Sequence, residues 1–402
     1  MKTNGTDKTK TVRRVFLIVL DGCGAGEAPD AHLFGDRGAH TLKSAFSTGK
    51  LHIPHLLSLG LGHIEGLSFL PKADAPAALY GRMRELAGGK DTTVGHWELS
   101  GVTRCEPLPT FPHGFPPAVI QKIEKISSRA VLCNRPYSGT RVIADYGEEH
   151  LKTGALIVYT SADSVCQIAA HEDVVPPKEL YRICREVRAF LQGDLGVGRV
   201  IARPFEGAAP NFRRTERRRD FSVEPPEETV LDALKKAGRD VIAVGKIEDI
   251  FAGRGMTDIL HTTNDTDAMQ AVLDQADTDF QGLLFANLSD FDMLYGHRRD
   301  ALGFAENLCR FDATLGRLLA KLSEDDLLIV TADHGTDPAF EKSTDHTREY
   351  VPLLLYRRGV TPVGVGTLDG FAHVAKTAAD VLGIDYPVKD AAVASLAPLL
   401  SR

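Results

Sequence analysis

The sequence predicts an α/β protein in which a central, mostly parallel sheet is flanked by helices and interrupted by an inserted domain. Short, continuously apolar runs alternate with amphipathic segments, which is typical of a parallel sheet covered on both faces. Three of these runs end in acidic residues. A stretch in the middle of the chain, bordered by prolines, has strand and helix signals of its own.

The expected core strands are short runs rich in Val, Ile and Leu. The first, 15–20, follows a charged arm and ends at Asp21 before a Gly-rich turn. Comparable runs lie at 241–244, 283–288, 327–331 and 351–356. Amphipathic segments such as 230–237 lie between them. Strand therefore alternates with helix, as in an α/β sheet.

The middle of the chain is expected to form an inserted α+β cap domain. Its edges are rich in proline, around 107–117 and at Pro225 and Pro226. From Leu180 to Leu191, apolar residues recur at steps of three and four, which indicates the buried face of a helix and not a site. We expect a discontinuous core domain, 1–106 and 227–402, and a cap domain, 107–226.

The composition favours neither nucleic acid nor an anionic membrane as a partner. The formal net charge is −7, and 25% of the residues are charged, as in ordinary globular proteins. The six cysteines form no C-x-x-C pair, so neither a zinc knuckle nor a disulfide framework is expected. A reducing cytoplasm is the expected location. No apolar run approaches the length that crosses a bilayer.

Acidic residues at the ends of three expected strands indicate a metal site. Asp21 follows the first strand, Asp290 and Asp292 follow 283–288, and Asp333 follows 327–331. Ligands of an open parallel sheet bind outside the carboxyl ends of its strands, so these acids can converge. A single Asp would more simply cap a helix. Three such acids, two of them with a histidine nearby, favour a metal site over helix capping.

Histidines complete the candidate ligand set. His334 follows Asp333, His297 lies five residues beyond Asp292, and His346 precedes the run 351–356. Carboxylate and imidazole without thiolate suit manganese, zinc, iron or magnesium. The candidate ligands are Asp21, Asp292, His297, Asp333, His334 and His346.

The segment 88–98 places two hydroxyls, those of Thr92 and Thr93, at an expected helix start. Free N–H groups and the positive end of the helix dipole favour a phosphate or an alkoxide there. Asp91, Thr92 or Thr93 could also cap the helix, and capping is compatible with nucleophilic attack. A metal ion lowers the pKa of a threonine hydroxyl that it coordinates.

With these residues assembled, the chain resembles the alkaline phosphatase superfamily and, within it, the phosphopentomutases over essentially its whole length. Asp333-His334-Gly335 is shared across the superfamily, whereas 159–164 and Gly95-His96-Trp97-Glu98 are specific to the mutases. Further matching segments are 20–21, 24–31, 89–92, 290–297 and 345–352. The pair Gly22-Cys23, Thr93 and Arg219 depart from the family pattern.

The resemblance implies two divalent metal ions, of which the family prefers manganese, and a threonine that is phosphorylated in the active enzyme. That threonine is Thr92. The first metal ion is assigned to Asp21, Asp333 and His334, and the second to Asp292, His297 and His346. In the cap, Ser161 and Asp163 are assigned to the ribose hydroxyls. The distal phosphate is assigned to Arg203, Arg218 and Lys246.

The implied reaction interconverts ribose 1-phosphate, or 2-deoxyribose 1-phosphate, with the 5-phosphate in nucleoside catabolism and salvage. Glucose 1,6-bisphosphate or ribose 1,5-bisphosphate would prime it. The oligomeric state is left open.

Three alternative functions compete with this prediction. A cofactor-independent phosphoglycerate mutase would have an Asn-Ser-Glu element where this chain has Asp91-Thr92-Thr93. A metal-dependent phosphatase needs no cap that excludes water. A nucleic-acid binding module could use the basic run 213–219, but Glu216 and Asp220 interrupt that run and the chain is acidic overall.

Overall fold

The chain divides into two compact units. A computed structural model describes residues 12–103, 106–161 and 164–400. Leu108–Glu224 form one unit, and Met1–Pro107 together with Pro225–Arg402 form the other. Each unit has its own sheet.

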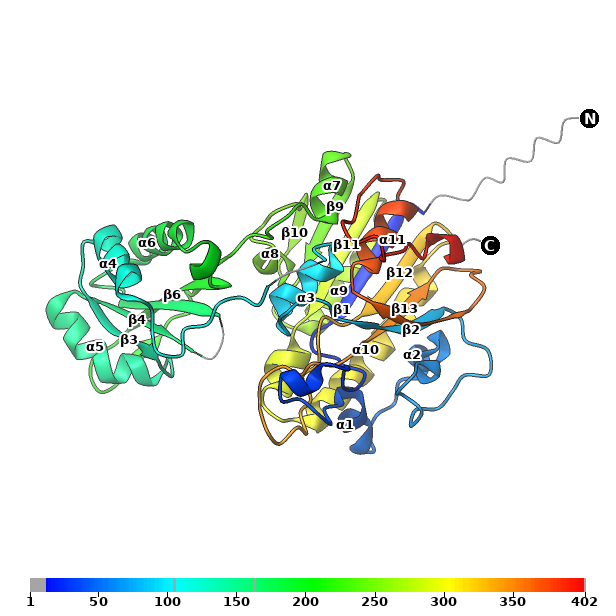
Figure 1. The fold of residues 1–402 in the computed structure, drawn as a ribbon, viewed down its shortest axis with the longest axis horizontal. Helices are drawn as coiled ribbons and strands as arrows, with labels where there is room; N and C mark the ends of the chain where they lie inside the picture. The colour runs from blue at the N-terminus through cyan, green and yellow to red at the C-terminus, as the bar shows by residue number, and fades with distance from the viewer. Residues whose placement is uncertain (1–11, 104–105, 162–163, 401–402) are drawn as a thin grey trace, which may run out of the picture. The chain divides into compact units, whose positions relative to one another are not determined.

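The larger unit is built on a sheet that has eight strands within the described residues (Figure 1). Their spatial order is β10 (Asp258–Leu260), β9 (Asp240–Val244), β11 (Gly282–Leu288), β1 (Arg14–Leu20), β12 (Asp326–Thr331), β13 (Val351–Tyr356), β2 (Leu79–Arg84) and β14 (Gly364–Asp369). β13 runs antiparallel to β12 and β2, and the other described pairs are parallel. The prediction of a mostly parallel α/β sheet is confirmed.

The three central strands end at the same edge of this sheet. β1 lies between β11 and β12, and Leu20 pairs with Leu288 while Val19 pairs with Thr331. All three strands are apolar along nearly their whole length because both of their faces are covered. The residues that follow them therefore emerge side by side.

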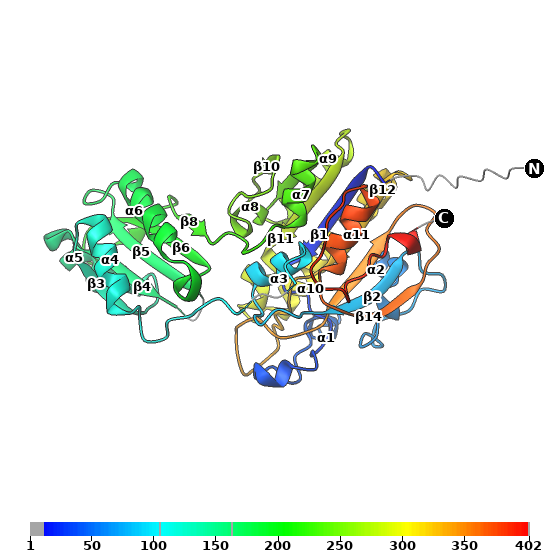
Figure 2. The ribbon, with the colours of Figure 1, turned by 45° about the horizontal axis from the view of Figure 1, so that its top comes forward.

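Helices cover both faces of the larger sheet (Figures 1 and 2). On one side, neighbouring helices are α1 (Thr41–Ser47), α2 (Pro54–Leu59), α9 (Asp265–Ala276) and α10 (Ala301–Lys321). On the other are α3 (Thr92–Leu99), α7 (Val230–Lys236), α8 (Ile247–Ile250) and α11 (His373–Val381). Among the described residues, none of the helices has the length and apolar character needed to span a membrane.

The smaller unit is a sheet with helices on both faces. Its strands are β3 (Val131–Pro136), β4 (Leu156–Thr160), β5 (Val165–His171) and β6 (Arg199–Glu206), and β6 also pairs with β7 (Arg213–Arg214) and β8 (Arg219–Ser222). Successive side chains of β4 point to opposite faces of this sheet. Leu156 and Val158 join the core beneath α4 (Pro117–Ser127) and α6 (Pro177–Phe190), whereas Ile157 and Tyr159 join the core beneath α5 (Arg141–Thr153).

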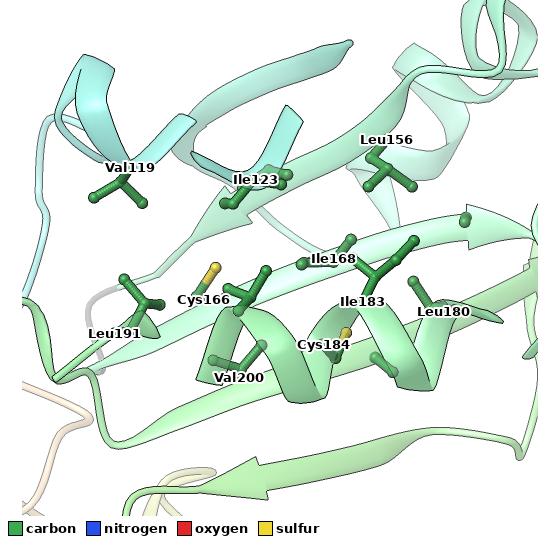
Figure 3. Close-up of a cluster of buried hydrophobic side chains, with 14 of the residues drawn as sticks. Val119, Ile123, Leu156, Cys166, Ile168, Leu180, Ile183, Cys184, Leu191 and Val200 are labelled. Atoms are coloured by element: carbon green, nitrogen blue, oxygen red, sulfur yellow. The ribbon is translucent and has the colours of Figure 1, made fainter. Parts of the chain in front are cut away.

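The helix expected from the apolar repeat at 180–191 is α6, and its apolar face is buried as predicted. Figure 3 shows Leu180, Ile183 and Cys184 of α6 with side chains of α4 and of the sheet, such as Val119 and Ile168. Each of these side chains is fully buried. They form the core on this face of the smaller sheet, as expected for packing residues.

We expect Ile183→Ala to lower the free energy of unfolding of the smaller unit by about 2–5 kcal/mol, because it leaves a cavity in a closely packed core. Urea denaturation followed by circular dichroism measures this change. Leu151→Ala is the matched control, since the Leu151 side chain is 39% exposed. Its effect should stay within about 0.5 kcal/mol, and an equal loss in both variants would contradict the assignment of α6 to the core.

Candidate metal centre

The structure brings the first three candidate ligands together at the edge where β1 and β12 end. Asp21 directly follows β1, and Asp333 and His334 follow β12 after Ala332. His334 Nε2 lies 3.3 Å from Asp21 Oδ1 and 3.3 Å from Asp333 Oδ2. The three residues are completely or almost completely buried. They form the first ligand group.

The second ligand group is Asp292, His297 and His346. A π-helical turn, Phe291–Gly296, follows β11 and sets the spacing of Asp292 and His297. His297 Nε2 lies 3.2 Å from Asp292 Oδ2, and His346 Nε2 lies 3.5 Å from Asp292 Oδ1. His346 comes from the segment that precedes β13.

The two ligand groups adjoin each other. The ring centroids of His334 and His346 are 4.1 Å apart. Thr336 Oγ1 donates to Asp292 Oδ1 at 2.8 Å and lies 3.3 Å from His334 Nδ1. One buried hydroxyl therefore contacts a member of each group, and the two groups are neighbouring candidate metal sites.

The donor atoms of both groups fit divalent metal ions. Asp333 Oδ2 is buried and makes no well-formed hydrogen bond among the described residues, although His96 Nδ1 lies 3.1 Å from it. His334 Nδ1 lies 3.0 Å from the Gly335 carbonyl, and His297 Nδ1 lies 2.6 Å from the Thr344 carbonyl. Each carbonyl holds the proton on Nδ1, so that Nε2 keeps a lone pair for a metal ion. Oxygen and imidazole donors without thiolate suit manganese, zinc, iron and magnesium.

The neighbouring carboxylates raise the pKa values of His334 and His297. Burial disfavours a charged His334 ring, but Asp333 and Asp21 outweigh that effect and raise the pKa of His334 well above its ordinary value. Burial also opposes charging of His297, and the hydrogen bond to Asp292 raises its pKa to about 9. The same negative field attracts metal cations, which must displace these protons.

Thr92 is the first residue of α3, and its hydroxyl faces the first ligand group. Thr92 Oγ1 lies 3.1 Å from His334 Nε2 and 3.4 Å from Asp21 Oδ1. Asp91 caps the helix by accepting from Val94 N–H at 3.1 Å. A Cβ at Gly95 would lie 2.3 Å from the Asp333 carbonyl oxygen, so only glycine lets α3 lie this close to the ligand edge.

Arg348 connects the segment of His346 with the segment that leads to Thr92. Its guanidinium donates to the Glu85 carboxylate at 2.7 Å and to the Gly89 carbonyl at 2.6 Å. It also donates to Asp30 Oδ2 at 3.0 Å. Arg348 and Glu85 are both almost completely buried. This ion pair therefore joins loops that are far apart in the sequence.

We expect Arg348→Ala to lower the free energy of unfolding by about 3–5 kcal/mol, because it leaves the Glu85 carboxylate buried without its cation. Urea denaturation is the measurement. Arg182→Ala is the matched control in the smaller unit, where Arg182 pairs with Glu179 at 2.7 Å but both side chains are 41% exposed. Its cost should be about 0–1 kcal/mol. Equal losses in the two variants would show that burial of the Arg348 pair does not matter.

The candidate residues for the distal phosphate lie in both units. Lys246 follows β9 in the larger unit, and its Nζ lies 2.6 Å from the sulfur of Met293, the residue after Asp292. Arg203 lies on β6, where burial and the charge of Arg218 lower its pKa to about 10. Arg218 donates to Asp220 at 2.7 and 2.6 Å.

The candidate residues for the ribose hydroxyls belong to the smaller unit. Ser161 follows β4. Asp163 lies outside the described residues.

Sequence reasoning assigned no role to two polar residues at the centre, Thr336 and Asn287. Thr336 links the two ligand groups as described above. Asn287 donates to Asp21 Oδ2 at 2.9 Å. A signal for Asn287 was present, because it is a lone amide inside the apolar run 283–288. No comparable signal marks Thr336.

The sheet and its two ligand groups define a metalloenzyme, and a family model described as the Metalloenzyme superfamily matches residues 13–386. A phosphopentomutase of Lachnoclostridium phytofermentans is 52% identical over 365 residues, which cover 90% of this chain and 93% of the relative. One of Deinococcus radiodurans is 51% identical over 377 residues, covering 93% and 97%. The chain therefore belongs to the phosphopentomutase family of isomerases.

Two solved structures that match this chain are more distant in sequence. One from Pyrococcus horikoshii is 15% identical with a TM-score of 0.47, and the match covers 94% of this chain and 98% of that chain. A protein of the alkaline phosphatase superfamily from Vibrio parahaemolyticus is 12% identical with a TM-score of 0.41, covering 94% and 67%.

Proposed function

We propose that this chain interconverts ribose 1-phosphate and 2-deoxyribose 1-phosphate with their 5-phosphates through a phosphothreonine at Thr92. The name of its relatives supports the pentose phosphate as substrate. The observation that carries the mechanism is the position of the Thr92 hydroxyl, at the start of α3 and 3.1 Å from His334 Nε2. The Thr92 hydroxyl therefore lies both at the start of α3 and beside the first ligand group.

Two divalent metal ions, which we expect to be manganese, would be held by the two ligand groups. When bound, they neutralise the charge of the transferring phosphoryl group and lower the pKa of a nearby hydroxyl. The chain orients the reacting groups around them. Asp91 fixes the first turn of α3, and the free N–H groups of that turn favour the phosphate.

In the proposed reaction, phospho-Thr92 gives its phosphoryl group to the 1-hydroxyl of ribose 5-phosphate. The P–O bond to Thr92 breaks, and the sugar becomes the 1,5-bisphosphate. The bisphosphate turns over and returns its 5-phosphoryl group to Thr92, which leaves ribose 1-phosphate and restores the phosphoenzyme. Ser161 and Asp163 are proposed to hold the ribose hydroxyls. Arg203, Arg218 and Lys246 are proposed to bind the phosphate that is not reacting.

The basic run of the smaller unit suits a small phosphate better than nucleic acid. Acidic partners already neutralise much of it, since Arg213 pairs with Glu206 and Arg217 pairs with Glu172, each at 2.8 Å. We propose a cytoplasmic role in nucleoside catabolism and salvage. The free thiols of Cys23, Cys133, Cys166, Cys184 and Cys309 support a reducing location.

A coupled assay with ribose 1-phosphate and ribose 5-phosphate, with and without manganese, tests this function. We expect isomerisation that requires manganese. We also expect activity to decay during turnover, because bisphosphate that escapes leaves Thr92 unphosphorylated, and to recover when glucose 1,6-bisphosphate is added. Steady phosphate release without isomerised sugar would instead show a phosphatase. Isomerisation of phosphoglycerates alone would show the other mutase activity.

A further inference from the structure

His96 is a completely buried histidine beneath the metal centre, in the segment Gly95-His96-Trp97-Glu98. Its neighbours in this segment anchor α3 to other parts of the larger unit. Trp97 Nε1 donates to the Ile250 carbonyl at 3.2 Å. The Glu98 carboxylate accepts from the backbone N–H groups of Leu86, Ala87 and Phe371. The anchoring fixes where the His96 ring lies.

One nitrogen of His96 contacts both the nucleophile segment and the first ligand group. His96 Nδ1 lies 2.8 Å from the Thr92 carbonyl oxygen and 3.1 Å from Asp333 Oδ2. Neither oxygen can donate, so the proton belongs on Nδ1. The ring is stacked on Phe285, with centroids 5.7 Å apart and planes at 22°. The stacking keeps the imidazole in this orientation.

The other nitrogen of His96 is reached by Asn287, whose side chain is 1% exposed in the otherwise apolar strand β11. Asn287 Nδ2 lies 3.2 Å from His96 Nε2 and donates to Asp21 Oδ2 at 2.9 Å. An amide nitrogen has two hydrogens, one for each acceptor. The flipped amide would place Oδ1 against the Asp21 carboxylate, where two acceptors repel each other.

The Asn287 side chain and the Gly22 backbone determine which carboxylate oxygens face the first ligand group. Asn287 engages Asp21 Oδ2 and leaves Asp21 Oδ1, which lies 3.3 Å from His334 Nε2. Gly22 N–H engages Asp333 Oδ1 at 3.0 Å and leaves Oδ2, beside His96. A buried polar side chain is costly unless it is hydrogen-bonded. Asn287 Oδ1 has no donor among the described residues, so the burial of this side chain depends on the two contacts of Nδ2.

We propose that His96 and Asn287 are positioning residues that align Thr92 with Asp21 and Asp333, so that nucleophile and first ligand group form one rigid unit. The proposal deepens the proposed function and rests on it for the role of Thr92. Neither side chain needs to touch the sugar. Their removal should therefore weaken metal binding and slow phosphoryl transfer without weakening substrate binding.

The test compares His96→Gln and Asn287→Leu with the matched control His373→Gln. His373 is another buried histidine of the larger unit, with Nδ1 2.8 Å from the Ala394 carbonyl and Nε2 3.2 Å from the Asp369 carbonyl. Manganese titration, thermal unfolding, kcat and KM are measured for each protein. Mass spectrometry after incubation with glucose 1,6-bisphosphate measures phosphorylation of Thr92. If Asn287→Leu does not fold, Asn287→Ser, which also breaks the bridge, replaces it.

We expect both variants to bind one of the two manganese ions about 10–100-fold more weakly and to lose a similar factor in kcat, with KM unchanged. The double variant should lose less than the product of the single losses, because the residues act through one bridge. His373→Gln should lower Tm without changing manganese affinity. Normal manganese affinity and kcat in His96→Gln and Asn287→Leu, or equal losses in His373→Gln, would overturn the proposal. Manganese affinity is measured without sugar, so a protein that fails to isomerise pentose phosphates would refute the proposed function and leave this readout intact.

Discussion

Thr92→Val is expected to lower mutase turnover by roughly 10⁴-fold or more, the scale on which removal of a covalent nucleophile acts. Valine keeps the branched shape of threonine at the first position of α3 and removes only the hydroxyl. The lost atom is the one that lies 3.1 Å from His334 Nε2 and 3.4 Å from Asp21 Oδ1. The coupled assay measures turnover, and peptide mass spectrometry after incubation with glucose 1,6-bisphosphate should find no phosphate on the variant.

Thr93→Val is the matched control for this prediction. Only one of two successive residues in a first helical turn can lie in line with the phosphorus and against the ligand group. The control should keep near-normal turnover and carry phosphate on Thr92. Phosphate on Thr93 in the unaltered chain would contradict the assignment of Thr92 as the nucleophile.

Asp333→Ala is expected to remove the first metal ion and to lower turnover by at least roughly 10³-fold, since bound metal supplies several kcal/mol of transition-state stabilisation. The variant loses the buried oxygen Oδ2, which faces the first ligand group, and also Oδ1, which accepts from Gly22 N–H at 3.0 Å. Elemental analysis should find fewer than two metal ions per chain.

The opposite end of the same strand offers a control for Asp333. Asp326 begins β12, is 1% exposed, and pairs with Arg14 at 2.6 Å. Asp326→Ala should destabilise the larger unit and keep both metal ions. If Asp333→Ala retained two metal ions per chain and near-normal turnover, the first ligand group would not be a metal site.

The central strands could be predicted from sequence because their burial is nearly complete. The runs 15–20, 283–288 and 327–331 are apolar on both faces, which is visible without knowing their partners. The edge strands β2 and β14 could not be predicted in this way. β2 alternates buried and half-buried residues, and β14 is largely exposed, so each depends on pairing with a neighbour. Nor does an apolar run reveal direction, and the antiparallel course of β13 was not foreseen.

The convergence of Asp21 and Asp333 could be predicted because parallel strands deliver their carboxyl ends to one edge. The structure brings the six candidate ligands into two groups there, and their binding of metal stays a prediction. The bridge through Thr336 and the bridge through Asn287 and His96 could not be foreseen, because each depends on how α3 and the loops meet the sheet. Gly95 is the residue that permits that approach.

The place of β1 between β11 and β12 has a consequence for how the protein is made. β1 ends at residue 20, whereas its two neighbours are complete only at residue 331. At ordinary rates of synthesis the ribosome needs roughly 15 to 60 s to bridge that interval. The smaller unit, Leu108–Glu224, is continuous and can bury its own core during this time. Until residue 331 has been synthesised, β1 lacks at least one of the two strands that flank it in the folded sheet. Asp21 gains Asp333 and His334 as neighbours only near the end of synthesis, so the first ligand group cannot assemble on an incomplete chain.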